Sequence, residues 1–149
     1  MDRIINNEAI VICSVVDALN LDVSNVSELF LYVVLTADRA IRNRLDDYSR
    51  YEDFVQKESA YYQALNRKFV EFQPVFLNAM TMLLLGGKIE KKDNYSEYNL
   101  TKEGLNMLFD FQNQDAGVME EVQNAVIHLS SLIWRIDVKT LYKDLKIVL

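Results

Sequence analysis

The sequence predicts a mostly α-helical fold, a helical domain that contains a winged helix-turn-helix-like unit with a small β-hairpin wing. Four glycines and one proline among 149 residues are few for a protein rich in tight turns, whereas helices need little of either. Apolar residues recur at three- and four-residue steps through most of the chain, which is the helical period. Two short extended runs at 88–91 and 97–100 flank a polar loop at 92–96 and predict the hairpin.

Composition indicates one globular domain. Half of the residues are hydrophobic and 26% are charged, an ordinary globular balance. We divide the domain into a helical part at 1–72, a winged-helix-like core at 51–111 and C-terminal helices at 116–149. Residues near the start lack the pattern of a signal peptide, and the longest uncharged stretch, 72–87, is too short for a membrane span. We therefore expect a cytoplasmic protein.

The first two helices should lie at the centre of the domain. Residues 7–19 are apolar almost all round, which is typical of a buried helix. A polar break at 21–27 follows, in which Ser24 and Ser27 are candidate N-caps. Residues 28–36 are nearly all apolar, and their helical neighbours favour a helix over a strand.

A charged segment at 38–48 and an aromatic segment at 51–72 come next. Arg39, Arg42 and Asp46 share one helical face, with Arg44 beside them. A solvated face with local ion pairs is the simpler interpretation, and contact with a phosphate or an acidic partner is the alternative. Aromatic residues at helical steps predict one or two helices packed on the core over 51–72.

Local signals mark the remaining elements. Pro74 should open a helix that ends at Gly86 and Gly87. Thr101 should cap the helix that follows the hairpin. Asp115 should cap a long helix with an apolar stripe from Val118 to Ile136, in which Leu129 lies centrally. The tail should form a short helix and then a strand at 146–149.

No group of residues predicts catalysis. The one His, His128, and the one Cys, Cys13, both lie in predicted helices without companion ligands or a basic partner. The Gly86-Gly87-Lys88 sequence lacks the other residues of a phosphate-binding loop. We therefore expect no catalytic, metal-binding or cofactor-binding residues, and no enzyme.

The helix before the wing argues against the usual DNA-reading role of a winged helix. Residues 74–85 contain no Lys, Arg or Gln, and base reading depends on such side chains. The net charge of −6 also disfavours nucleic acid over the whole surface. We expect protein contacts instead, with Phe76, Met80, Tyr95, Trp134 and Tyr142 as candidate interface residues. Phosphate contacts would fall to Lys88, Lys91, Lys92, Arg39 and Arg42.

Several sequence features are similar to those of a known family. They are Asn6-Asn7-Glu8, the segment from Phe72-Gln73-Pro74 to Asn78, residues 84–89, the run from Leu100 to Gly104, and the closing Leu141-Tyr142 with Leu145 and Ile147. In these the chain resembles the middle components of bacterial three-component ABC systems, which include the small middle subunit of Lamassu-type anti-phage complexes.

The resemblance implies a non-catalytic adaptor. Such a subunit would bind an SMC-like ATPase with a long coiled coil and an effector, often a nuclease, in a complex that senses foreign DNA. The alternative is a stand-alone winged-helix DNA-binding transcriptional regulator, favoured by the wing and its basic residues. An antitoxin or other small inhibitor would share the same acidic profile.

Overall fold

The computed structural model describes residues 2–19, 25–92, 97–112 and 116–149, with the side chains of 2–7, 112 and 116 excluded. Within these ranges the chain forms eight helices and one two-stranded antiparallel sheet, which confirms the predicted mostly helical class. In chain order the elements are α1 (Asp2–Leu19), α2 (Val26–Ala37), α3 (Arg39–Leu45), α4 (Tyr51–Ser59), α5 (Tyr62–Leu85), β1 (Ile89–Lys91), β2 (Tyr98–Leu100), α6 (Lys102–Gln112), α7 (Ala116–Leu132) and α8 (Val138–Asp144).

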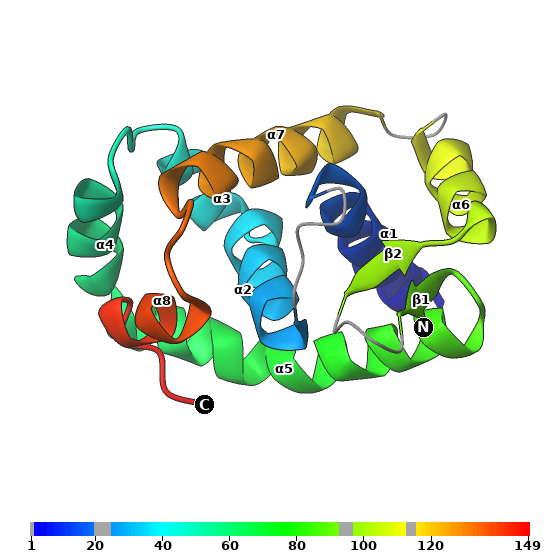
Figure 1. Ribbon diagram of the computed structural model, residues 1–149, viewed down its shortest axis with the longest axis horizontal. Helices are drawn as coiled ribbons and strands as arrows, with labels where there is room; N and C mark the ends of the chain where they lie inside the picture. Colours follow the sequence, from blue (N-terminus) through cyan, green and yellow to red (C-terminus); the bar gives the residue numbers. More distant parts are fainter. Residues whose placement is uncertain (1, 20–24, 93–96, 113–115) are drawn as a thin grey trace.

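Two long helices form opposite edges of the molecule. Figure 1 shows α5 along the bottom edge and α7 along the top edge, with α1 and α2 between them. Both central helices contact both edge helices. The helices α4 and α8 lie at one end of the molecule, whereas α6 and the hairpin lie at the other (Figure 1).

Helix α2 is the centre of the core. Every residue from 29 to 36 is buried, as expected for a helix that is apolar on all sides. Asn25 caps its N-terminus, because the Asn25 side chain accepts a hydrogen bond of 2.8 Å from the Glu28 N–H. The predicted cap Ser27 instead lies inside α2, and Ser24 lies outside the described residues.

A cluster of phenylalanines joins α2 to α5. The Phe30 ring lies edge-on to Phe69, with 5.4 Å between ring centroids, and 5.0 Å from Phe76. Phe69 and Phe76 come from the buried face of α5, which also contributes Leu65, Ala79, Met80 and Leu83. The aromatic segment at 51–72 is therefore only partly core, because Phe54 of α4 and Phe69 of α5 are buried whereas Tyr61 and Tyr62 are exposed.

Pro74 does not open a helix. It lies inside α5, which is continuous for 24 residues. A proline removes one backbone hydrogen bond and costs about 3 kcal/mol in a helix interior. The helix continues because Phe69 and Phe76, on either side of Pro74, are both buried against α2, and burial of each stabilises the protein by about 1.5–3 kcal/mol.

The hairpin and its flanking turns follow the predicted signals. Strands β1 and β2 pair with Ile89 opposite Leu100 and Lys91 opposite Tyr98. Helix α5 ends at Gly86 and Gly87, where Gly87 adopts a left-handed φ of 69°. Thr101 caps α6, since its Oγ1 accepts a hydrogen bond of 3.1 Å from the Gly104 N–H.

The C-terminal part departs from the predicted boundaries. Helix α7 ends at Leu132, so Ile136 is not part of it, and Val118 is exposed although the predicted stripe included it. Residues 146–149 do not form a strand in the described structure, because the Val148 N–H bonds to the Asn66 side chain rather than to a β-ladder. Asp115 lies outside the described residues.

A buried ion pair joins α3 to α4. The Glu58 carboxylate, which is fully buried, accepts hydrogen bonds from Nε and Nη2 of Arg44 at 2.9 and 2.8 Å and a third from the Tyr48 hydroxyl. The Arg44 guanidinium also lies 4.9 Å from the centroid of the Tyr61 ring. These contacts hold the α3–α4 corner against the start of α5.

Candidate interaction surface

The exposed face of the second half of α5 is largely apolar and uncharged. Residues 72–87 contain no charged side chain, yet Leu77 is 50% exposed and Leu85 is 85% exposed. Helix α5 therefore has apolar residues on two faces, one packed on α1 and α2 and one open to solvent. Large exposed apolar surfaces of this kind mark sites of protein contact.

Exposed residues on this face repeat with alternating steps of four and three. Val70, Pro74, Leu77, Thr81 and Leu84 are all exposed. That spacing places them in one line along a helix and is the spacing of a coiled-coil contact. We call these five residues the α5 seam. A second helix laid along α5 would cover it.

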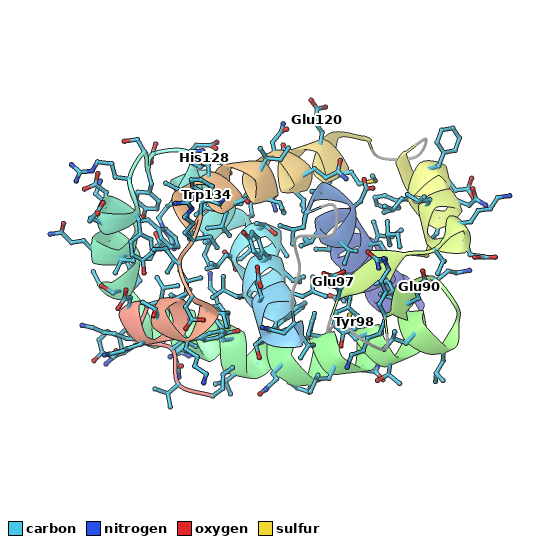
Figure 2. All side chains as sticks on the ribbon, viewed as in Figure 1. Glu90, Glu97, Tyr98, Glu120, His128 and Trp134 are labelled. Carbon is cyan, nitrogen blue, oxygen red and sulfur yellow. The ribbon has the colours of Figure 1, made fainter. Side chains whose placement is uncertain are left out.

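Two further large apolar side chains are exposed on or just after α7. Trp134, just after α7, is 69% exposed, and the Arg135 guanidinium lies 4.3 Å from the centroid of its ring. Ile127 is also exposed, seven residues before Trp134. Figure 2 shows Trp134 near the C-terminal end of α7. Exposed tryptophans beside arginines are frequent centres of binding energy in interfaces.

Two of the predicted interface residues belong to the core. Phe76 and Met80 are buried between α5 and its neighbours, so they cannot contact a partner, and that part of the prediction is wrong. Periodicity alone could not distinguish the two apolar faces of α5. Leu77 and Leu84, which the prediction omitted, lie on the open face. Tyr95 lies outside the described residues.

Tyr142 has a structural contact. Its hydroxyl donates a hydrogen bond of 2.8 Å to the Ser27 carbonyl, and its ring lies edge-on to Phe69. Burial raises the pKa of the Tyr142 hydroxyl above its ordinary value. The residue joins α8 to α2 and α5, and its partly buried ring is less available to a partner than Trp134.

The predicted phosphate-binding residues do not form one site. Lys91 and Lys92 are exposed and Lys88 is half-buried on the hairpin, whereas Arg39 is exposed on α3. Helix α3 and the hairpin lie toward opposite ends of the molecule (Figure 1). The five residues therefore cannot contact one short stretch of phosphates together.

Arg42 is a structural residue rather than a phosphate ligand. Its side chain is 11% exposed. Nη1 donates to the carbonyls of Thr36 and Ala37 at the end of α2, at 2.9 and 3.2 Å, and Nη2 pairs with Glu121 of α7 at 3.3 Å. A cation at these C-terminal carbonyls also complements the helix dipole. The prediction of a phosphate contact at Arg42 is wrong.

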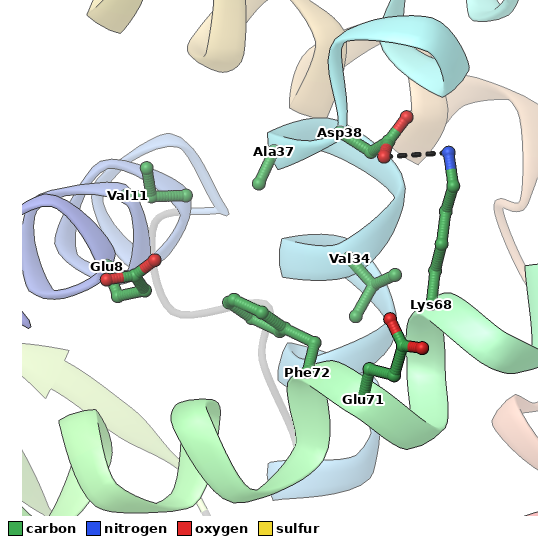
Figure 3. A pocket seen from close by; sticks show the side chains of 8 residues that line it. All are labelled: Glu8, Val11, Val34, Ala37, Asp38, Lys68, Glu71 and Phe72. Atoms are coloured by element: carbon green, nitrogen blue, oxygen red, sulfur yellow. Dashed lines mark ion pairs between the residues drawn. The ribbon is translucent and has the colours of Figure 1, made fainter. Parts of the chain in front are cut away.

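A pocket of about 400 Å³ lies beside the α5 seam, between α1, α2 and α5. Figure 3 shows its lining, in which the Phe72 ring points from α5 toward α1. Lys68 Nζ lies 2.8 Å from Asp38 Oδ2, and the Ile41 N–H donates to Asp38 Oδ1 at 3.0 Å. Burial opposes ionisation of Asp38, but these donors outweigh it and hold the pKa of the carboxyl below its usual value.

His128 and Cys13 each have a structural environment. His128 Nε2 lies 2.8 Å from the backbone oxygen of Tyr48. Burial raises the pKa of the Cys13 thiol to about 12, so it is protonated at neutral pH, which is the unreactive form. Among the described residues no group of His, Cys, Asp and Glu could hold a metal ion.

No family model, curated protein or solved structure matches the chain. Among the described residues no helix has the length and apolar character that crossing a membrane requires. The exposed residues of α5 and Trp134 are therefore the features on which a function can be proposed.

Proposed function

We propose that this chain is a non-catalytic, protein-binding adaptor subunit whose main docking surface is the α5 seam. The observation that carries the proposal is the exposure of an uncharged, largely apolar face on the second half of the longest described helix. Alternating steps of four and three suit a helical partner, because they keep the contacting side chains in line over successive turns. The α5 seam, from Val70 to Leu84, extends over about 21 Å, so a helical partner would contact it over about four turns.

A protein partner fits this surface better than DNA does. Nucleic-acid affinity comes mainly from Lys and Arg at phosphates, and the open face of α5 has no cation from residue 69 to residue 87. Lys91 and Lys92 on the hairpin remain available for a few non-specific phosphate contacts. We further propose that α5, the hairpin and α6 form a winged-helix-like unit, because they follow one another in helix–hairpin–helix order.

Exposed apolar residues on two separate elements support a bridging role. The seam belongs to α5, and Trp134 follows the end of α7, on the other side of the central helices α1 and α2 (Figure 1 and Figure 2). An adaptor that joins two proteins needs two surfaces that can be occupied at once. Together with the resemblance to middle components of three-component ABC systems, this favours an SMC-like ATPase with a coiled coil as one partner and an effector as the other, in anti-phage or anti-plasmid defence.

Co-expression with the products of the genes beside its own tests the proposal. We expect a stable complex with a coiled-coil ATPase, and a loss of affinity of at least tenfold in Leu77→Arg, because a charge would be buried at the centre of the contact. Leu105→Arg is the matched control, since Leu105 on α6 is 48% exposed and Leu77 is 50% exposed.

Two results would overturn the adaptor proposal. One is a complex with unchanged affinity in Leu77→Arg when circular dichroism shows both variants folded. The other is sequence-specific DNA binding by the isolated chain at moderate salt, measured by fluorescence anisotropy. The second result would establish the regulator alternative.

A further inference from the structure

A row of cations begins just after α7 and continues along α8. It consists of Arg135, Lys139, Lys143 and Lys146, which are all exposed and follow one another at steps of four, four and three. None of them forms an ion pair with a residue that the structure describes. One helical turn, about 6 Å along the axis, separates Lys139 from Lys143. We call these four residues the basic ridge.

The opposite face of α8 is fixed to the rest of the molecule. Leu141 and Leu145 are buried in the core, and the Tyr142 hydroxyl donates a hydrogen bond of 2.8 Å to the Ser27 carbonyl. These contacts hold α8 against the body of the protein, so the ridge side chains remain on the solvent side. The ridge is therefore available to a partner without any change of fold.

The carboxylates of the same segment do not neutralise the ridge. Residues 135–149 contain two of them, Asp137 and Asp144. Asp144 Oδ2 accepts a hydrogen bond of 2.7 Å from the Tyr51 hydroxyl of α4, and Asp137 forms no ion pair within the described ranges. The segment thus has two more cations than carboxylates, whereas the whole chain has a net charge of −6.

Apolar and aromatic side chains lie beside the ridge. The Arg135 guanidinium lies 4.3 Å from the ring centroid of Trp134, which is 69% exposed. At the other end of the ridge, Lys146 Nζ lies 5.5 Å from the ring centroid of Tyr62. A pocket of about 460 Å³ borders the ridge at Lys139, and its apolar lining residues are Val138, Tyr142, Ile147 and Leu149.

We propose that the basic ridge binds an acidic segment of a protein, in which apolar residues lie among several Asp or Glu. The carboxylates would pair with the ridge cations, and the apolar residues would cover Trp134 and enter the pocket at Lys139. Charge complementarity of this kind selects a partner and speeds association. This inference rests on the adaptor function, because it names the chemistry of the partner expected at Trp134.

A protein segment suits this surface better than a nucleic acid does. Phosphate neutralisation supplies most of the affinity for nucleic acid, and the net charge of −6 opposes it outside the ridge. The pocket at Lys139 has aliphatic walls, which an aliphatic side chain can pack against.

A titration of the full chain with two peptides tests the proposal. The chain has one tryptophan, so its emission reports on Trp134 alone. The probe is a peptide of about ten residues with two leucines among glutamates, and the control has the same leucines among glutamines. The acidic peptide should shift the Trp134 emission to shorter wavelength in a saturable way, because it removes water from the indole. The neutral peptide should bind at least tenfold more weakly.

Charge-neutralising variants locate the site. Lys139→Gln/Lys143→Gln should weaken the acidic peptide at least fivefold. Lys91→Gln/Lys92→Gln makes the same change of net charge at exposed cations of the hairpin, at the other end of the molecule (Figure 1), and should leave the affinity unchanged. All four positions are exposed, so circular dichroism should show both variants folded. Raising the salt concentration from about 0.05 M to about 0.3 M should also weaken the acidic peptide, since salt screens exposed charges.

Four results would overturn the proposal. Two are equal affinity for the acidic and neutral peptides, and equal weakening in both double variants. Tenfold tighter binding of a single-stranded oligonucleotide of the same charge would assign the ridge to nucleic acid. A dimer that Lys139→Gln/Lys143→Gln dissociates, measured by sedimentation, would assign it to a second copy of the chain. None of these measurements uses the α5 partner, so their failure leaves the α5 seam to its own test.

Discussion

Replacing Glu58 with alanine should destabilise the protein by about 3–5 kcal/mol, the range for removing one partner of a buried ion pair. The change removes the acceptor of three hydrogen bonds, two from Arg44 and one from Tyr48. Hydrogen bonds to a charged group contribute about 1.5–3 kcal/mol each. The net loss is smaller than their sum, because the Arg44 side chain is 32% exposed and water can solvate it after the change.

Chemical and thermal unfolding followed by circular dichroism measure this loss. For a domain of this size the melting temperature should fall by about 6–20 °C, at about 2–4 °C per kcal/mol. Glu52→Ala is the matched control on the same helix. Its ion pair with Arg50 is 3.6 Å long and both side chains are 71% exposed, so its stability should change by less than about 0.5 kcal/mol.

A double replacement separates two effects on stability, the loss of the ion pair and the presence of one charge without a partner. Arg44→Met/Glu58→Met removes both charges and should be more stable than Glu58→Ala, because no uncompensated charge remains, whereas the Tyr48 hydroxyl loses its acceptor in both variants. The reasoning is refuted if Glu58→Ala unfolds at the same midpoint as Glu52→Ala. It is also refuted if the double variant is less stable than the single one.

Three further predictions follow from buried residues. Leu129→Ala should cost about 2–5 kcal/mol in chemical unfolding, whereas Ile127→Ala, at a residue 60% exposed, should cost far less; equal losses would contradict the placement of α7. Gly104→Ala should cost about 1–3 kcal/mol, because a Cβ there would lie 2.2 Å from the Lys88 carbonyl oxygen; a variant as stable as the wild type would show that this contact is not tight. The buried Cys13 thiol should resist a thiol reagent until the chain unfolds. The ordinary pKa of this thiol is 9.0 and burial raises it to about 12, so the unfolded chain loses this proton first and stability should fall between pH 9 and pH 12. Cys13→Ala should show a smaller fall over that range, and an identical fall would assign the effect to other groups.

Elements with strong local signals were predictable from the sequence. The apolar run of α2, the glycine stop at Gly86 and the cap at Thr101 all depend on residues within one or two turns. Each appears in the structure near its expected place. Their free energies are local, so the local sequence contains enough information to predict them.

Features that depend on distant contacts were not predictable in the same way. Pro74 signals a helix start, but α5 continues through it because residues on both sides are packed against α2. Arg42 has the sequence context of a solvated cation, yet one of its partners is Glu121, which lies 79 positions away in the chain. The interface prediction placed partner contacts on α5 but selected the buried Phe76 and Met80, because periodicity cannot say which of two apolar faces meets the core.

The two faces of α5 explain why a partner is expected along this helix. Leu65, Phe69, Phe76 and Leu83 belong to the buried face of α5, which contacts α1 and α2, whereas Leu77, Leu84 and Leu85 are exposed. Polar residues at those positions would preserve the buried face and improve solubility. A partner along α5 would cover these apolar side chains, and the absence of cations between residues 69 and 87 makes a protein helix a better cover than a nucleic acid.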